Sequence, residues 1–378
     1  MSQPRQLYAD SPSVQLLEPW MRKHLPQLDE TVIRRLIQLT TGIFEQRSAL
    51  LERIAEGSAF TANSVSNLTQ VGRILRDERI TLAEVYYPFM REILSTMETD
   101  TFYLAMDESS HQDDFNIFQV GLVTDAMVLP LGCFLYATDA AWAEEARTVL
   151  TTVAGLLPCG KPVILLADRL HTGPPLLTCV AQLGWHYVFR AASATYVETC
   201  QGWKMLRTLK ARSREGRFLQ QVRIWKSSSV TTNISIYRHV RPGFRTVIWF
   251  VVSSLPACQE RFAEYACRWW QECGFKTTKS GLFDWEHGRV TIFSRVEVLL
   301  IGIYCTLWAL WIIGRQHEYI PCRKSTTTTP QHRHKTIIKQ AIAIYVCAIK
   351  HKRPLTIGAP PAPRVLSYER TLRSGIAA

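Results

Sequence analysis

A short segment in the last third of the chain combines one carboxylate with three side chains that can hold phosphate groups. Residues 264–286 carry a phenol, a guanidinium, a carboxylate and an ammonium, which belong to Tyr265, Arg268, Glu272 and Lys279. At about 100° per residue, all four fall in one narrow stripe if the segment is a continuous α-helix. Such a stripe is unusual for a core. It suits a surface that holds a metal ion and binds phosphates.

Two aspartates elsewhere in the chain come at the ends of predicted strands. Strands are expected at 101–107, 115–123, 128–136, 161–168 and 185–190, and helices at 141–157 and 172–184. This order is typical of a ribonuclease H-like α/β fold, a mixed sheet with helices on both faces. The strands that end at Asp107 and Asp168 lie side by side in such a sheet, so these two carboxylates should meet at one edge.

Asp107, Asp168 and Glu272 therefore come from two strand ends and one helix face that can converge on one point. Carboxylate oxygens are the ligands that hard divalent cations such as Mg²⁺ prefer. Two ions about 3.5–4 Å apart would activate a nucleophile and stabilise the leaving oxygen of a phosphoryl transfer. A single aspartate at a strand end is weak evidence, because many such residues are turn caps.

The remaining parts of the chain have simpler patterns. Residues 28–100 read as helices, with Arg73 and Arg76 on the surface of one of them. A helix-turn-helix DNA reader and an ordinary helical bundle explain this part equally well. Residues 192–256 predict an all-β insertion with a basic rim. The pattern is lost after residue 319 in a basic tail, within which residues 341–349 could pack as a short helix or strand.

Charge and composition restrict the class of protein. The 378 residues carry a net charge of +12, and 47% are hydrophobic, which excludes global disorder and favours a polyanionic partner such as nucleic acid. The ten cysteines include no CxxC pair, which fits a reducing cytoplasm. Residues 298–313 are uncharged but shorter than the ~20 residues that span a bilayer, so a buried helix is expected and no membrane contact.

The spacing of Tyr265, Arg268, Glu272 and Lys279 resembles the signature of the DDE-type insertion-sequence transposases of the IS-four family. The MDES block at Asp107 and the LLADRLHTGPPLL block around Asp168 also resemble that family. The resemblance covers roughly residues 30–315.

The resemblance implies a role for each of these residues. Asp107, Asp168 and Glu272 would bind Mg²⁺ or Mn²⁺, with two ions in the site. Transposon-end DNA would be held by the other residues of the signature, Tyr265, Arg268 and Lys279. Trp269 matches an aromatic residue that stacks on a flipped base, with a core position as the alternative. Arg190 resembles an arginine near the site, and an ion pair at the strand end is an equal alternative.

The expected function is cut-and-paste DNA transposition in a bacterial cytoplasm, with the protein associated with the nucleoid when it is bound to DNA. The partners would be double-stranded DNA, as terminal inverted repeats and target, and a second copy of the chain in a homodimer. A metal-dependent nuclease without strand transfer and a catalytically silent DNA-binding protein are the alternatives. The expected parts are a helical DNA-binding domain at 1–100, the catalytic core at 101–191 and 257–318, the insertion at 192–256 and the tail at 319–378.

Overall fold

The computed structural model describes residues 11–112, 114–124, 127–137, 143–209, 216–239, 247–317 and 336–363. The chain forms two compact units, each assembled from separate stretches of sequence. The helical unit comprises Met1–Glu98, His111–Phe115 and Phe275–Ala362, and the sheet unit comprises Thr99–Ser110, Asn116–Gly274 and Pro363–Ala378. Each unit is described by itself below.

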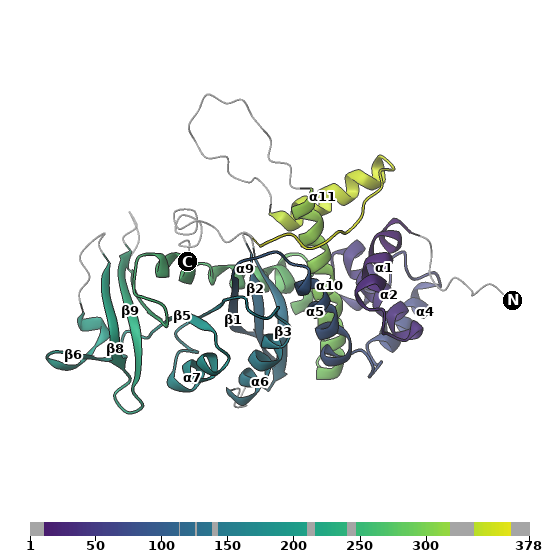
Figure 1. The fold of residues 1–378 in the computed structure, drawn as a ribbon. Helices are drawn as coiled ribbons and strands as arrows, with labels where there is room; N and C mark the ends of the chain where they lie inside the picture. The colour runs from purple at the N-terminus through teal and green to yellow at the C-terminus, as the bar shows by residue number, and fades with distance from the viewer. Residues whose placement is uncertain are drawn as a thin grey trace, which may run out of the picture. The chain divides into compact units, whose positions relative to one another are not determined.

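The sheet unit is built on ten strands in the order β3-β2-β1-β4-β5-β10-β9-β8-β6-β7 (Figure 1). The first five strands are β1 Phe102–His111, β2 Phe115–Val123, β3 Val128–Tyr136, β4 Val163–Ala167 and β5 His186–Arg190. The other five are β6 Tyr196–Thr199, β7 Gly202–Met205, β8 Arg217–Ile224, β9 Val230–His239 and β10 Val247–Ser253. The sheet is mixed, since β1, β4 and β5 are parallel while β2 and β3 form an antiparallel pair.

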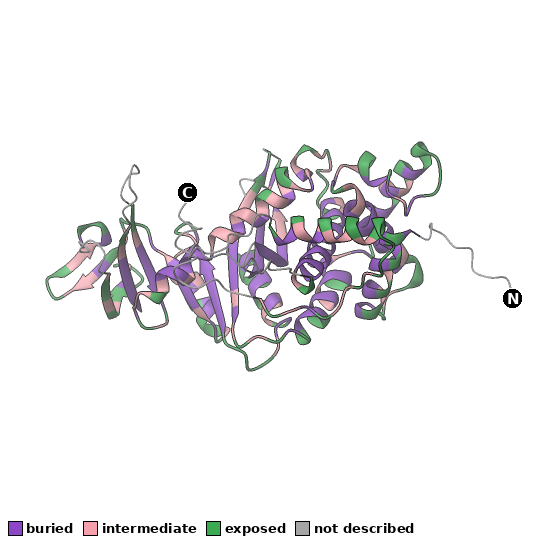
Figure 2. Ribbon diagram, turned by 90° about the horizontal axis from the view of Figure 1, so that it is seen from above, coloured by how far each residue is buried: buried purple, intermediate pink, exposed green. Residues whose placement is uncertain are grey.

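The order of β1 to β5 confirms the ribonuclease H-like fold predicted from the sequence. Helices α6 (Ala143–Ala154) and α7 (Pro174–Gln182) join β3 to β4 and β4 to β5. Both faces of the central strands are covered, which explains why β4 is apolar at every position. Figure 2 shows the buried residues running through these strands.

One face of the sheet is covered by the segment that carries the signature residues. Side chains of Ile164 and Leu166 on β4 form a buried cluster with Phe262 and Tyr265 of α8 (Glu260–Ala266). The expected continuous helix is wrong, because a turn at Cys267 and Arg268 separates α8 from α9 (Trp269–Lys276). In this turn the backbone N–H of Arg268 donates to Tyr265 O over 3.0 Å, which is a tighter pattern than that of an α-helix.

The strands between residues 192 and 256 extend this same sheet. β10 pairs antiparallel with both β5 and β9, and β8, β6 and β7 follow towards the edge. The sequence correctly placed β structure here. Residues 210–215 of the predicted basic rim lie outside the described residues.

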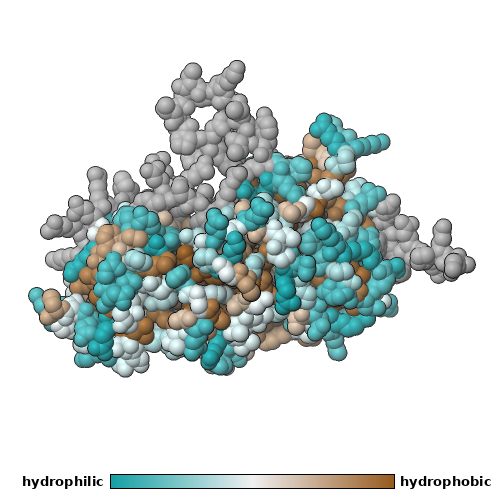
Figure 3. All heavy atoms as spheres, in the orientation of Figure 1, coloured by the Kyte–Doolittle hydropathy of each residue, from teal (hydrophilic) through white to brown (hydrophobic). Residues whose placement is uncertain are grey.

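The helical unit contains the N-terminal helices and the last part of the described chain. Its N-terminal members are α1 Pro12–His24, α2 Glu30–Gln46, α3 Leu51–Ile54, α4 Ser64–Ile74, η1 Leu82–Tyr86 and α5 Tyr87–Ser95. The others are η3 Thr277–Gly281, η4 Trp285–His287, α10 Phe293–Gln316 and α11 Ile337–Lys350. On the face seen in Figure 3, hydrophilic side chains cover much of these helices.

Helix α10 is the core of this unit. By length and composition it could cross a membrane, but 94% of its most apolar window is buried inside the protein, as the sequence analysis expected of a core helix. Gly302 allows α2 to approach closely, since a Cβ there would lie 2.8 Å from Ile43 and 2.9 Å from Leu39.

Residues 337–350 of the expected tail form α11, which includes the segment 341–349 where a short helix or a strand was left open from the sequence. Ile337 and Ala341 of this helix are fully buried, and Tyr345 packs edge-on against Phe44 of α2 with ring centroids 4.8 Å apart. Residues 319–335 and 364–378 of the predicted tail lie outside the described residues.

Candidate active site

The two aspartates come at the same level on neighbouring parallel strands. Ala105 of β1 lies opposite Leu166 of β4, so Asp107 and Asp168 follow two residues later on each strand. β4 ends at Ala167, whereas β1 continues to His111. The sequence therefore places both carboxylates at the carboxyl edge of the parallel strands, where open α/β sheets bind their ligands.

Arg268 connects two of the three carboxylates. Its Nη1 donates to Asp107 Oδ2 over 2.8 Å, and its Nη2 donates to Glu272 Oε1 over 2.6 Å. The side chain of Arg268 is only 12% exposed, while that of Glu272 is 40% exposed. The turn between α8 and α9 is what directs this guanidinium between β1 and α9.

Burial alone would lower the pKa of Arg268, but the neighbouring oxygen groups outweigh it. The Tyr265 oxygen and the Asp107 carboxylate raise the pKa well above its usual range. Arg268 is therefore a fixed positive charge at the centre of the site.

Asp168 is held by a different set of donors. The backbone N–H of Arg169 donates to Asp168 Oδ1 over 2.7 Å, and the Tyr265 hydroxyl donates to the same oxygen over 3.1 Å. Burial by itself raises the pKa of Asp168. The hydrogen bond from the Arg169 N–H and the charge of Arg268 lower it by more, so the pKa lies below its ordinary value. Asp168 is thus ionised at neutral pH.

The buried Tyr265 remains a proton donor. Burial raises the pKa of its phenol to about 12, so the hydroxyl keeps its proton at neutral pH. Arg190, at the end of β5, adds its charge to the field at both Tyr265 and Asp168. The sequence prediction that Arg190 lies near the site is consistent with this placement.

Other predicted residues are not brought into this cluster. Trp269 and Trp270 are both half-buried, and Trp270 packs against the buried cluster of the sheet unit. Lys279 lies on η3, and Arg73 and Arg76 belong to α4 and its end, all in the helical unit.

His171 was given no role by the sequence analysis but is part of the cluster. Its Nε2 lies 3.5 Å from Asp107 Oδ1, and its side chain is 1% exposed. The sequence feature that could have indicated His171 is its position three residues after Asp168, in the loop that follows β4.

Comparison with known proteins gives the family of the chain. The family model described as "Transposase DDE domain" matches residues 107–309, which is more than half of the chain. The chain belongs to the DDE transposase family. The matched segment of this transposase begins at Asp107 and contains both Asp168 and Glu272. The finer placement in the IS-four family stays a prediction.

The transposase also has a distant likeness among solved structures. A piggyBac transposase synaptic complex with hairpin DNA matches with a TM-score of 0.39 and 10% sequence identity. The match covers 98% of this chain and 77% of the other. No curated protein sequence matches the chain.

The carboxylates of the DDE domain have the right chemistry for a divalent cation, but Arg268 occupies the space between two of them. Within the described parts of the chain, no three side chains of His, Cys, Asp or Glu are grouped closely enough to hold a metal ion. Asp107 and Glu272 both bond the guanidinium of Arg268 instead. If Arg268 released both carboxylates, the oxygens of Asp107 on β1 and Glu272 on α9 would be free to bind a cation.

Proposed function

We propose that the protein is a cut-and-paste DNA transposase that cleaves at terminal inverted repeats and joins the 3′-hydroxyl ends to target DNA. Asp107, Asp168 and Glu272 would be the catalytic carboxylates and the ligands of two Mg²⁺ or Mn²⁺ ions. The observation that carries this proposal is the gathering of all three around Arg268 and Tyr265 inside a DDE domain. The divalent ions, once bound, would supply an activated water and stabilise the leaving oxygen.

Each residue of the cluster has a task that its contacts support. Tyr265 and the Arg169 N–H orient Asp168 and keep it ionised. Asp107 is contacted from two sides, by Arg268 and by the buried His171. These contacts hold both strand-end carboxylates in place before any ligand enters.

Arg268 is placed to exchange partners when DNA binds. A guanidinium that bonds two carboxylates can instead bond two oxygens of one phosphate, because the two groups have similar bidentate geometry. Arg268 would then bond a DNA phosphate at the cleaved end. Asp107 and Glu272 would become available as ligands of the metal ions. Binding of DNA and formation of the metal site are coupled in this proposal.

The further contacts with DNA follow from the family signature and are part of the proposal. Lys279 would bind a phosphate near the cleaved end, and the half-exposed Trp269 would stack on a base. A homodimer bridging two transposon ends, acting on DNA in a bacterial cytoplasm, completes the proposed function.

A cleavage assay tests the central claim. A linear duplex that carries the element's own terminal repeats is incubated with the wild-type protein, with Mg²⁺ or with EDTA, and with Glu272→Gln. We expect cuts at the repeat ends only for the wild type with Mg²⁺. Cleavage by Glu272→Gln at the wild-type rate would show that the catalytic assignment is wrong.

A second assay separates transposition from the nuclease alternative. Pre-cut ends with free 3′-hydroxyls are mixed with a supercoiled target, and joined products are followed on a gel. A transposase gives joined products that depend on Mg²⁺. Cleavage in the first assay without joining in this one would favour a nuclease with the same fold.

A further inference from the structure

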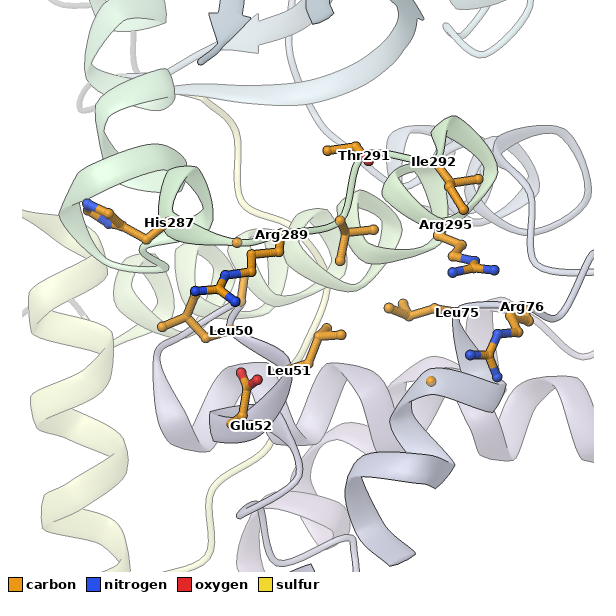
Figure 4. Close-up of a pocket in the computed structure, with 14 residues that line it drawn as sticks. Leu50, Leu51, Glu52, Leu75, Arg76, His287, Arg289, Thr291, Ile292 and Arg295 are labelled. Atoms are coloured by element: carbon orange, nitrogen blue, oxygen red, sulfur yellow. The ribbon is translucent and has the colours of Figure 1, made fainter. Parts of the chain in front are cut away.

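A cavity in the helical unit gathers arginine side chains from two distant parts of the sequence. It has a volume of about 500 Å³ and lies between the start of α3, the end of α4 and the segment from η4 to α10 (Figure 4). Its charged lining consists of Arg76, Arg289, Arg295, His287 and a single acid, Glu52. Arg289 and Arg295 belong to no motif of the sequence.

The arginines that line this cavity differ from many others in the same unit in having no acidic partner. No ion pair is found for Arg76, Arg289 or Arg295 within the part of the chain that the structure describes. Elsewhere in the unit, arginines are paired with acids: Arg22 and Arg34 with Glu30, Arg53 with Glu56, and Arg35 and Arg79 with Asp77. Within the described residues, the three arginines of the lining thus lack the acidic partners that these other arginines have.

The lining combines spread positive charge with an apolar floor. In Figure 4, Arg289 lies at one end of the cavity beside Leu50, and Arg295 and Arg76 lie together at the other end. Leu51 and Leu75 lie between these ends. Like charges that face one space repel, and a ligand with several anionic oxygens would relieve this repulsion.

We propose that this cavity binds the sugar-phosphate backbone of DNA. Guanidiniums at both ends fit successive phosphates of one strand, with deoxyribose over the leucines between them, better than they fit one small anion. Guanidiniums suit phosphate because their donors match its oxygens in pairs. The net charge of +12 agrees with a polyanionic ligand.

The contact is to backbone and adds affinity without reading the sequence. Its residues belong to the helical unit, whereas those of the carboxylate cluster belong to the sheet unit. The inference rests on the proposed function only in taking duplex DNA as the ligand.

The test measures how salt weakens DNA binding. Full-length protein is titrated into a fluorescent 30-base-pair duplex in EDTA, by anisotropy at several chloride concentrations, with two unrelated sequences. Each lost phosphate contact reduces the slope of log K against log salt by about 0.9. We expect Arg289→Gln/Arg295→Gln to reduce the slope by about two units on both sequences, and Arg289→Lys/Arg295→Lys to keep it.

Matched variants make the result specific. Arg91→Gln removes an exposed arginine of α5 that does not line the cavity, and it should leave the slope unchanged. Thermal melting shows whether each variant is folded. Equal slopes for the wild type and the Arg289→Gln/Arg295→Gln variant would overturn the inference. So would stabilisation of the wild type alone by inorganic phosphate, if the DNA slope did not change.

The outcome for this cavity is distinguishable from that of the proposed function. If the wild type does not bind duplex DNA at all, both the proposed function and the inference fail. If the cavity variants lower the salt slope but the wild type neither cleaves nor joins DNA, only the proposed function fails. If the wild type binds DNA and Glu272→Gln has the same salt slope as the wild type, loss of the catalytic carboxylate does not affect this measurement. The salt slopes of the cavity variants and of the wild type then decide the inference.

Discussion

At the scale of single residues, Arg268 determines the state of the site. Its guanidinium neutralises part of the charge on Asp107 and Glu272. A divalent cation must compete with this charge, and a positive charge a few ångströms from a cation costs several kcal/mol at the effective dielectric of a protein. On the proposed function, Arg268 would therefore weaken metal binding until another anion binds its guanidinium.

We predict that Arg268→Gln binds Mn²⁺ about tenfold more tightly than the wild type in the absence of DNA, an energy of about 1.4 kcal/mol. The same variant should bind terminal-repeat DNA more weakly. Mn²⁺ binding is measured by electron paramagnetic resonance, which does not depend on activity. Arg223→Gln on β8, four strands away from β4 in the sheet, is the control. Weaker Mn²⁺ binding by Arg268→Gln would contradict the competition.

Asp77 gives a second prediction at this scale. Hydrogen bonds from Arg79, over 2.8 Å, and from Arg35 lower the pKa of the buried Asp77 to about 2 from its ordinary value of 3.8. A lowered carboxyl pKa stabilises the fold above the unfolded pKa, and this stability is lost as the pH falls through the folded one. Asp77→Asn should lower the free energy of unfolding by about 2 kcal/mol at pH 7.

The difference between wild type and Asp77→Asn should shrink as the pH falls from about 4 towards 2. Urea denaturation at pH 7, 4 and 3 measures it. Glu56→Gln removes an exposed ion pair with Arg53 and should change stability by less than about 1 kcal/mol at any of these pH values. A difference for Asp77→Asn that is independent of pH would show that its charge is not what stabilises the fold.

At the scale of elements, the close contact of α10 and α11 gives a prediction about the end of the described chain. A Cβ on Gly314 would lie 2.5 Å from the backbone oxygen of Ile337, which cannot move without shifting α11. Gly314→Ala should therefore loosen α11. We expect faster amide hydrogen exchange over residues 337–350, with little change in the sheet unit.

Gly155→Ala is the matched control, since its nearest contact would be an ordinary 3.4 Å from Thr152 O. Amide exchange that is equally slow in wild type and Gly314→Ala would mean that α11 does not depend on this contact.

The sequence predicted the elements better than their continuity. Buried strands such as β4 are visible as apolar runs, and their order predicted where Asp107 and Asp168 would meet. Helical periodicity alone could not reveal the turn at Cys267 and Arg268, because a short 3₁₀-like turn keeps nearly the same side-chain spacing. For α11 the sequence left a helix and a strand open, because the partners that decide between them, on α10 and α2, are far away in the sequence.

The residues of the candidate site could be predicted from the sequence, but most of the hydrogen bonds between them could not. The strand ends supplied the two aspartates, and the family signature supplied Glu272, Tyr265 and Arg268. The bond from Arg268 to Asp107 depends on a turn between α8 and α9 that local pattern does not encode. His171 was not predicted, because a histidine in a loop has no periodicity that would place it against Asp107.

At the scale of the whole molecule, α10 raises the question of whether the protein is held in a membrane. Its most apolar window is 94% buried, with the large side chains of Trp308 and Trp311 fully enclosed. Exposing this helix to lipid would break its contacts with α2 and α11. The cavity left in the core would cost free energy. A core helix and a membrane span therefore exclude each other here.

We predict that the full-length chain stays in the soluble fraction without detergent and does not float with lipid vesicles in a density gradient. Vesicles of neutral lipid are used, because the net charge of +12 would attract anionic lipid regardless of α10. Ile303→Lys places a charge at a fully buried position of α10 and should unfold the helical unit, with a loss of at least about 3 kcal/mol. Flotation of the wild type with neutral vesicles would mean that α10 leaves the core, and the helical unit would then have a different organisation from the one described.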